Sequence, residues 1–376
     1  MTPGGTKKIF ISDIHMGDAR SQAGDHPYGW LYSNISNLAN FLEEQLIAPD
    51  VAEVVILGDL FDTWVIPTIL YPLNSYEEIY SNDENSPVIE ALKKLAAESK
   101  LSYVPGNHDM AFSTTDLAGT KQFMETRFPE IRYICDPDLP TGVYRSGKLV
   151  AEHGNRYCLF NAPDTWTKQP SFLPIGYFIS RLVAYKVYTT GTPEDFHDIL
   201  KKFIMQLIKR PNFVQDLYEA IAKDAGLADT DIIEMNGIAS FPGTITVGGI
   251  SAIYGQLIQN WESDPNRIGW EIAAREDAGD LALAANHILF SSGQDIVVFG
   301  HTHVPTLKRI FLGEPLEEGV DIHLDLPCHA IYANSGTWVD SVKSTYVETQ
   351  EDAGRQYVRL WNYPSKTLLR EAFVEL

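Results

Sequence analysis

The chain alternates short apolar runs with clusters of polar residues, and each apolar run ends at a polar cluster. Five such runs occupy residues 8–12, 54–57, 101–105, 148–152 and 295–299. Short runs rich in Val, Ile and Leu that end at a glycine or a polar residue are typical of buried β-strands. We therefore predict five buried strands, each followed by a polar loop.

Between the first three predicted strands, the apolar residues change to a helical spacing. Ile35, Leu38 and Leu42 recur at intervals of three and four residues, and a similar pattern covers residues 88–95. Strands that alternate with helices predict parallel βαβ units, and functional residues gather at the carboxyl ends of such strands. All five polar clusters occupy that position, which predicts a functional site there.

Residues 160–293 carry mostly helical patterns and separate the fourth predicted strand from the fifth. We predict a core made of residues 1–159 and 294–376, with 160–293 as a mostly helical insertion or cap. The most apolar stretch, residues 172–188, contains Arg181 and Lys186 and is too short for a confident membrane span. It forms either an apolar lid or the core of the cap.

Composition narrows the choice of partners and compartment. The 29 basic and 50 acidic residues give a net charge of −21, which argues against binding to nucleic acid. The three cysteines are widely spaced and suggest no disulfide framework, so reduced thiols are expected. The first residues lack the apolar core of a signal peptide, and we predict a cytoplasmic protein.

The polar clusters contain the donors of a metal site. His301 and His303 are two residues apart, so both point the same way if the extended path of the strand persists. Carboxylate, amide and imidazole groups together suit a pair of divalent transition ions better than calcium or magnesium alone. Two such ions about 3.5–4 Å apart can hold a hydroxide and clamp a phosphoryl group for in-line attack.

The order of the clusters resembles the calcineurin-like metallophosphoesterase superfamily. That family shows D-x-H, G-D-x-x-D, G-N-H-D, H-G and G-H-x-H, and this chain has "DIH", "GDLFD", "GNHD", "HG" and "GHTH" in the same order. The resemblance covers about residues 8–158 and 294–340. It implies an α/β (α+β) fold of two packed mixed β-sheets flanked by helices, to which the helical insertion is added.

The resemblance also implies a role for each matching residue. The first metal ion would be held by Asp13, His15 and His303, the second by Asn107, His153 and His301, and Asp59 would bridge the two. The ions would be manganese, iron or zinc, among which the sequence does not choose.

The resemblance further implies a catalytic group that does not bind metal. His108 would stabilise the developing charge or protonate the leaving oxygen, while Asp62 and Asp109 would orient imidazoles or position the loops. Asp62 can also be read as a turn residue, and Asp109 as a helix cap. After the fourth motif, Arg156 and Asn161 would either touch the substrate phosphate or pack against the cap.

We therefore predict a metal-dependent hydrolase that cleaves a phosphodiester or pyrophosphate bond. Protein phosphatases of the family typically show G-N-H-E, which differs from "GNHD" here. The UDP-2,3-diacylglucosamine hydrolases are distantly similar and carry a shorter helical insertion after H-G. A small or lipid-linked phosphoester is the expected substrate, with peripheral membrane contact in the second case. A phosphomonoesterase or nucleotidase, a nuclease and a non-catalytic scaffold are the alternatives, and the oligomeric state is not predicted.

Overall fold

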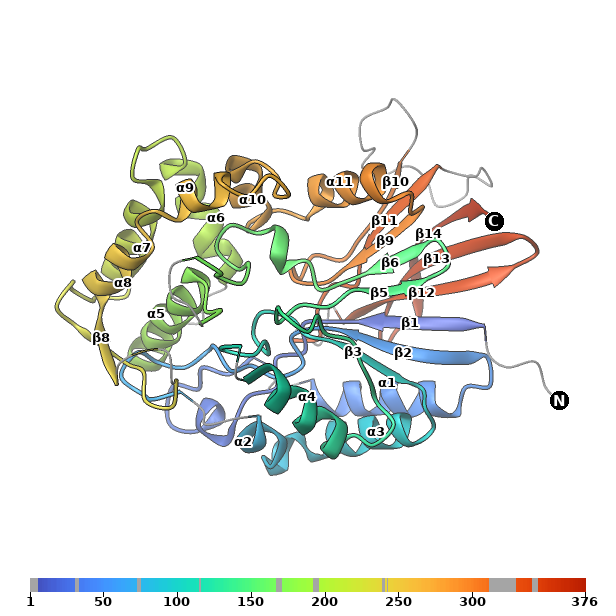
Figure 1. Cartoon of the computed structure of the whole chain (residues 1–376). Helices are drawn as coiled ribbons and strands as arrows, with labels where there is room; N and C mark the ends of the chain where they lie inside the picture. The colour runs from blue at the N-terminus through green and yellow to red at the C-terminus, as the bar shows by residue number, and fades with distance from the viewer. Residues whose placement is uncertain are drawn as a thin grey trace.

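Two β-sheets packed face to face make up the right half of the molecule in Figure 1. The computed structural model describes residues 6–30, 34–72, 76–114, 116–166, 171–191, 196–238, 241, 243–310, 329–339 and 344–376. The strand orders are β14-β13-β12-β1-β2-β3-β4 in the larger sheet and β10-β11-β9-β6-β5 in the smaller one. Both sheets mix parallel and antiparallel pairs, and helices flank them, which confirms the predicted fold class.

The larger sheet combines the predicted βαβ units with a C-terminal meander. Its strands are β1 (Lys7–Ile11), β2 (Val51–Leu57), β3 (Leu101–Val104), β4 (Arg132–Tyr133), β12 (Thr345–Asp352), β13 (Arg355–Asn362) and β14 (Thr367–Glu375). The first four are parallel, and the last three are antiparallel. The helices of this half are η1 (Ala19–Gln22), α1 (Ile35–Ile47), α2 (Glu77–Tyr80), η2 (Asp83–Asn85), α3 (Ser86–Ala97) and α4 (Asp116–Arg127).

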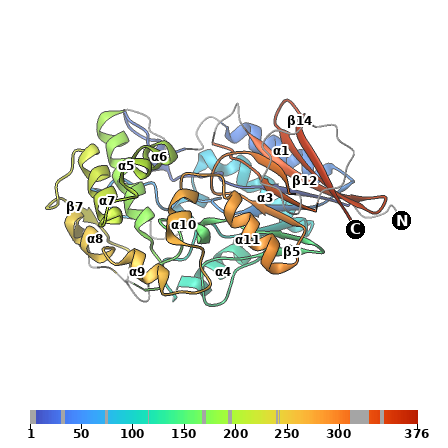
Figure 2. The same cartoon turned by 90° about the horizontal axis from the view of Figure 1, so that it is seen from above.

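The smaller sheet contains the other two predicted strands. It consists of β5 (Tyr144–Ser146), β6 (Leu149–Ala151), β9 (Ile296–Phe299), β10 (Thr306–Ile310) and β11 (Ala330–Asn334). Strand β9 lies between β6 and β11 and is parallel to both. Helix α11 (Ala282–Ser292) covers the outer face of this sheet, as Figure 2 shows from above.

The period of two in a strand explains how each sheet faces two cores. Ile9 and Ile11 of β1 belong to the apolar cluster beneath α1 and α3, whereas Phe10 belongs to the cluster between the sheets. Because β1, β2 and β3 are parallel, their carboxyl ends meet at one edge. The loops that carry the predicted site residues therefore start from neighbouring points.

The cap is the separate group of helices on the left of Figure 1. Its elements are α5 (Ile175–Thr190), α6 (Phe196–Leu207), α7 (Phe213–Asp224), β7 (Ile232–Glu234), β8 (Thr244–Thr246), α8 (Val247–Ile253), α9 (Leu257–Glu262) and α10 (Trp270–Glu276). Every residue from Ile175 to Ala184 is buried, so this apolar stretch lies in the core of the cap. Among the described residues, no helix is both long and apolar enough to cross a bilayer. The boundaries of core and cap remain a prediction.

A buried arginine of α5 joins the cap to the loop that follows β2. Arg181 is fully buried, and its guanidinium donates hydrogen bonds to the backbone carbonyls of Ile66 (3.3 Å), Pro67 (3.2 Å) and Leu70. It also donates to the carbonyl of Glu234 in β7. The planar fork of arginine donors can serve several carbonyls at once, so a single side chain fixes this part of the loop to the cap.

Candidate metal centre

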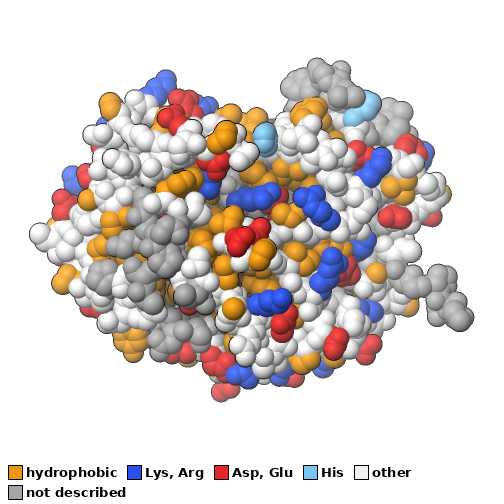
Figure 3. All heavy atoms as spheres, viewed as in Figure 1, with side chains coloured by type: hydrophobic (Ala, Val, Ile, Leu, Met, Phe, Trp, Pro, Cys, Tyr) orange, Lys and Arg blue, Asp and Glu red, His pale blue; other side chains and the backbone are white. Residues whose placement is uncertain are grey.

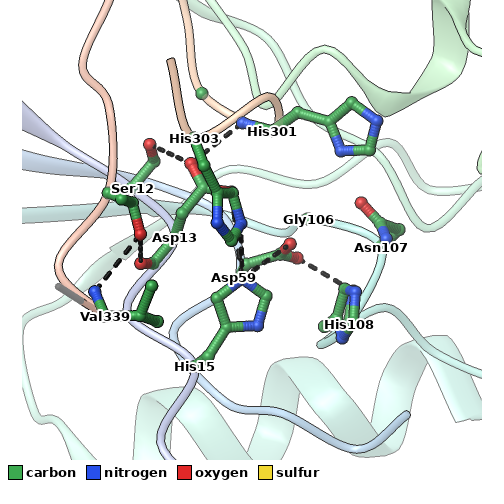
Figure 4. A network of polar contacts seen from close by, with 12 residues as sticks. Ser12, Asp13, His15, Asp59, Gly106, Asn107, His108, His301, His303 and Val339 are labelled. Atoms are coloured by element: carbon green, nitrogen blue, oxygen red, sulfur yellow. Dashed lines mark hydrogen bonds and ion pairs between the residues drawn. The ribbon is translucent and has the colours of Figure 1, made fainter. Parts of the chain in front are cut away.

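Loops at the strand ends turn sharply and bring the predicted ligands together. Asp13, His15, Asp59, His301 and His303 all have left-handed backbone conformations, with φ between 53° and 73°. Residues other than glycine rarely adopt this conformation, and those that do cluster at functional sites. The turns aim side chains from segments far apart in the sequence at one place (Figure 4).

The first group of ligands consists of Asp13, His15 and His303. His303 Nε2 lies 3.4 Å from Asp13 Oδ1 and 3.1 Å from His15 Nε2. Asp13 and His15 come from the loop after β1, and His303 comes from the loop after β9. Two ring nitrogens and a carboxylate oxygen this close together form a pocket that suits a divalent cation.

The second group consists of Asp59, Asn107, His153 and His301. His153 Nε2 lies 3.0 Å from Asn107 Oδ1 and 3.2 Å from Asp59 Oδ2. The rings of His153 and His301 are 5.0 Å apart between centroids. Ligand atoms of Asp59, His153 and His301 all lie within 4.8 Å of one another, so this group can hold a second cation.

Asp59 lies between the two groups. Its Oδ2 atom is 3.2 Å from His153 Nε2 in the second group and 3.7 Å from His15 Nε2 in the first. Its Oδ1 atom accepts a hydrogen bond of 2.8 Å from the backbone N–H of His108. A carboxylate held in this way can bind a cation on either side, which is the arrangement expected of a bridging ligand.

Hydrogen bonds at the far side of two rings fix which nitrogen faces the centre. His153 Nδ1 lies 2.7 Å from the carbonyl of Leu57, which can only accept, so Nδ1 carries the proton. His15 Nδ1 is held in the same way by Asp62 Oδ2 at 3.0 Å. The Nε2 atoms therefore face the centre and are the atoms available for metal ligation.

The carboxylates give the centre a strong attraction for positive charge. Burial lowers the pKa of His153, but the charge and hydrogen bond of Asp59, the charge of Asp13 and the Leu57 carbonyl together outweigh burial and raise this pKa to about 9. Burial raises the pKa of Asp13, but the charge and hydrogen bond of His303 and the charge of His153 together outweigh burial and lower this pKa to about 2. Both shifts have the same meaning: the buried acids of the centre stabilise cationic neighbours.

His108 lies beside the two groups and is held by Asp62. Asp62 Oδ1 lies 3.1 Å from His108 Nδ1, while Oδ2 of the same carboxylate contacts His15. Burial lowers the pKa of His108, but the charges of Asp62 and Asp59 and the hydrogen bond to Asp62 together raise it above its usual value. Trp64 packs against the other side, with its ring 4.8 Å from that of His108. Asp62 therefore orients two imidazoles rather than serving only as a turn residue.

Asp109 fastens two loops to each other. Its Oδ1 atom accepts from the backbone N–H of Gly106 at 2.7 Å, and Oδ2 accepts from that of Leu60 at 2.6 Å. Gly106 must be a glycine, because a Cβ there would lie 2.2 Å from Asp59 Oδ1. Asp109 thus positions the loops that carry Asp59 and Asn107.

The two predicted substrate residues lie in different surroundings. Arg156 Nε forms an ion pair of 2.6 Å with Glu152, and the arginine side chain is 41% exposed. Asn161 is 2% exposed, and its Nδ2 atom donates to Asp277 of the cap at 2.8 Å. Asn161 therefore packs against the cap, and contact of either residue with a substrate remains a prediction.

Two neighbours of the centre were not assigned a role from the sequence. Trp30 packs edge-on against His15, with ring centroids 4.5 Å apart. Asn334 donates to the carbonyl of Gly300 at 2.7 Å and so supports the turn that carries His301. The segment "NSGTW" around Asn334 was a usable signal, whereas nothing in the spacing around Trp30 pointed to the site.

The comparison with protein-family models agrees with this geometry. A family model described as calcineurin-like phosphoesterase matches residues 6–305. A solved structure of Vacuolar Protein Sorting 29 from Cryptosporidium parvum is similar at 12% identity and a TM-score of 0.31, over 100% of this chain and 99% of that one. Purple acid phosphatase PPD1 from yellow lupin (Lupinus luteus) seeds is similar at 9% identity and a TM-score of 0.41, over 98% of this chain and 53% of that one. Both TM-scores are too low to carry an argument, and no curated protein matched.

Proposed function

The chain belongs to the calcineurin-like phosphoesterase family, and we propose that it is a dimetal-dependent phosphohydrolase that cleaves a phosphodiester or pyrophosphate bond. One observation carries the proposal: a single oxygen of Asp59 lies within 3.7 Å of imidazole nitrogens from both ligand groups. A shared carboxylate is what a two-metal phosphoester hydrolase needs.

The donor set fits two divalent ions. Asp13, His15 and His303 would hold the first ion, Asn107, His153 and His301 would hold the second, and Asp59 would contact both. Such ions supply positive charge to the phosphoryl oxygens and make a water molecule more acidic. Manganese, iron and zinc all accept these ligands.

The protein residues then orient the reaction. Asp62 holds the rings of His15 and His108 in fixed positions, and the raised pKa of His108 favours its protonated form. We assign this proton to the leaving oxygen, and we assign in-line attack to water on the opposite side of the phosphorus. Trp64 and Trp30 pack around the imidazoles and limit the access of bulk water.

The substrate we propose is a small or lipid-linked phosphoester. The net charge of −21 disfavours a nuclease. The apolar stretch of α5 is buried in the cap and gives no support to a lipid-facing lid. A phosphomonoesterase or nucleotidase is the main alternative for the reaction. A non-catalytic scaffold is disfavoured because every ligand position and His108 are present.

Hydrolysis of two model substrates tests the proposal. Metal-stripped protein is reloaded with Mn²⁺ and assayed with bis-p-nitrophenyl phosphate and with p-nitrophenyl phosphate. We expect metal-dependent cleavage with a preference for the diester. Asp59→Asn should lower bound metal, measured by plasma mass spectrometry, and reduce turnover by at least about 100-fold. Asp352→Asn, at an exposed position of β12, is the matched control and should leave both unchanged.

Three outcomes separate the alternatives. Preference for the monoester would replace the diesterase proposal by a phosphatase or nucleotidase. Stoichiometric metal binding without cleavage of either substrate would favour the scaffold. Full activity of pure, folded Asp59→Asn would refute the site assignment itself.

A further inference from the structure

A cavity of about 410 Å³ lies between the outer face of the five-stranded sheet and the cap. Its walls come from β5, from the end of β6, from the η3 turn (Asn155–Tyr157), from the segment between α9 and α10, and from α11. Its lining includes the polar side chains of Arg145, Glu152, Arg156, Arg267 and His287. A volume of this size is typical of sites for small molecules.

The cavity is distinct from the metal centre. In β6, Val150 packs in the cluster beneath α11, whereas Ala151 packs between the two sheets. Alternation returns Glu152 to the side of α11, where it lines the cavity, while the next residue, His153, contributes to the metal centre. None of the predicted metal ligands is among the residues that line the cavity.

Cations outnumber anions in these walls, although the whole chain has a net charge of −21. Arg156 pairs with Glu152 at 2.6 Å, and Arg267 pairs with Asp264 at 3.4 Å. Arg145 forms no side-chain hydrogen bond or ion pair with any of the described residues. In the surface view of Figure 3, Lys and Arg side chains are grouped near the centre of the face shown, with acidic side chains among them.

Aromatic rings hold two of the guanidinium groups in place. Arg267 lies between Trp166 and Trp261, at 4.3 and 4.2 Å from the ring centroids. Its Nη1 atom is buried and has no hydrogen-bond partner among the described residues. Arg156 stacks over Tyr157 at 5.0 Å. Arginines immobilised in this way lose little entropy when they bind an oxyanion, which their planar donors match.

We propose that this cavity binds a small polyanionic molecule bearing phosphate or carboxylate groups, at a site separate from the metal centre. Arg145 and Arg156 of the core and Arg267 of the cap all line it, together with His287 of α11. Guanidinium groups contributed by both core and cap favour a ligand with at least two charged groups. A ligand bound there contacts core and cap together and restricts movement between them.

Isothermal titration calorimetry on the metal-stripped full chain tests this site. The probes are inorganic pyrophosphate and citrate at low ionic strength, which separate phosphate from carboxylate recognition. Removing the metals takes the divalent cations away from that centre and leaves its buried carboxylates, so an anion gains little attraction there. We expect saturable binding of at least one probe, weakened at least about 10-fold by Arg145→Gln, which is about 1.4 kcal/mol. Lys148 is a cation of the same hairpin but lies outside the cavity, so Lys148→Gln should leave binding unchanged.

A second variant locates the site without removing charge. Ser291 is exposed on α11 and lines the cavity, so Ser291→Trp should block it and abolish binding while the far-UV circular dichroism spectrum stays unchanged. Failure of both probes to bind below about 10 mM would overturn the proposal. Equal binding by wild type and Arg145→Gln would also overturn it. Because the protein carries no metal in this assay, these outcomes are independent of whether the enzyme is active.

Discussion

Arg181→Met is expected to destabilise the fold by about 2–4 kcal/mol. Methionine keeps a long unbranched side chain but has no donors, and no other donor among the described residues reaches the carbonyls of Ile66 and Leu70. Each buried carbonyl left without a partner costs about 1–3 kcal/mol. Relief from burying a charge offsets part of this loss. Ile66 is buried and Leu70 is half-buried, so the Leu70 carbonyl should cost less than the Ile66 carbonyl. The net cost of losing both hydrogen bonds is therefore about 2–4 kcal/mol.

Urea unfolding followed by tryptophan fluorescence measures the effect of this substitution. Arg181→Lys should lie between wild type and Arg181→Met, because an ammonium cannot reach carbonyls spread over both the loop and β7. Arg210→Met is the matched control in the cap. Its side chain is 60% exposed and pairs with Asp216 only at the surface, so its effect should stay within about 0.5 kcal/mol. If Arg181→Met proved as stable as Arg210→Met, the proposal that Arg181 stabilises the junction of loop and cap would be wrong.

Further predictions concern the metal centre and the pH dependence of stability. In Asp62→Asn only one side-chain oxygen remains to accept hydrogen bonds from the two imidazoles that Asp62 now holds. We therefore expect kcat/KM for the preferred model substrate to fall about 10- to 100-fold with an unchanged far-UV circular dichroism spectrum. Wild-type kinetics in this variant would exclude the orienting role of Asp62. Gly106→Ala places a Cβ 2.2 Å from Asp59 Oδ1 and should weaken Mn²⁺ affinity at least about 10-fold in a competition titration, whereas Gly119→Ala, with open space around its Cβ, should not. Burial raises the pKa of Glu276 from 4.5 to about 7, so the folded chain keeps a proton that the unfolded chain releases between these values. Stability should then fall as the pH rises through this interval, by an amount on the order of 3 kcal/mol. In urea midpoints measured at pH 5 and pH 8, Glu276→Gln should flatten this slope, and an equally steep slope in the variant would contradict the assignment.

The strand ends could be predicted from the sequence because their signals are local. Five apolar runs coincide with β1, β2, β3, β6 and β9, and the loops that follow carry the seven predicted ligands. The division into two sheets could not be derived from these runs. Strand β6 pairs with β9, about 150 residues later, through contacts that no short window of sequence contains.

The contacts between core and cap were harder to predict for the same reason. Arg181 appeared only as a charge that interrupts an apolar helix, whereas its partners are backbone carbonyls in a loop more than 100 residues earlier. Asp277 showed no motif, and its hydrogen bond to Asn161 depends on how the cap docks. Backbone carbonyls have no sequence identity, so a side chain that serves them gives no pattern.

The position of β9 within the smaller sheet has a consequence for synthesis of the chain. His153 emerges from the ribosome about 150 residues before His301 and His303, which corresponds to roughly 7–30 s at about 5–20 residues per second. During that interval β6 lacks the partner that later lies beside it, and its edge is open to other nascent chains. Both ligand groups remain incomplete until β9 inserts, so metal uptake during translation should come only after the cap has been made.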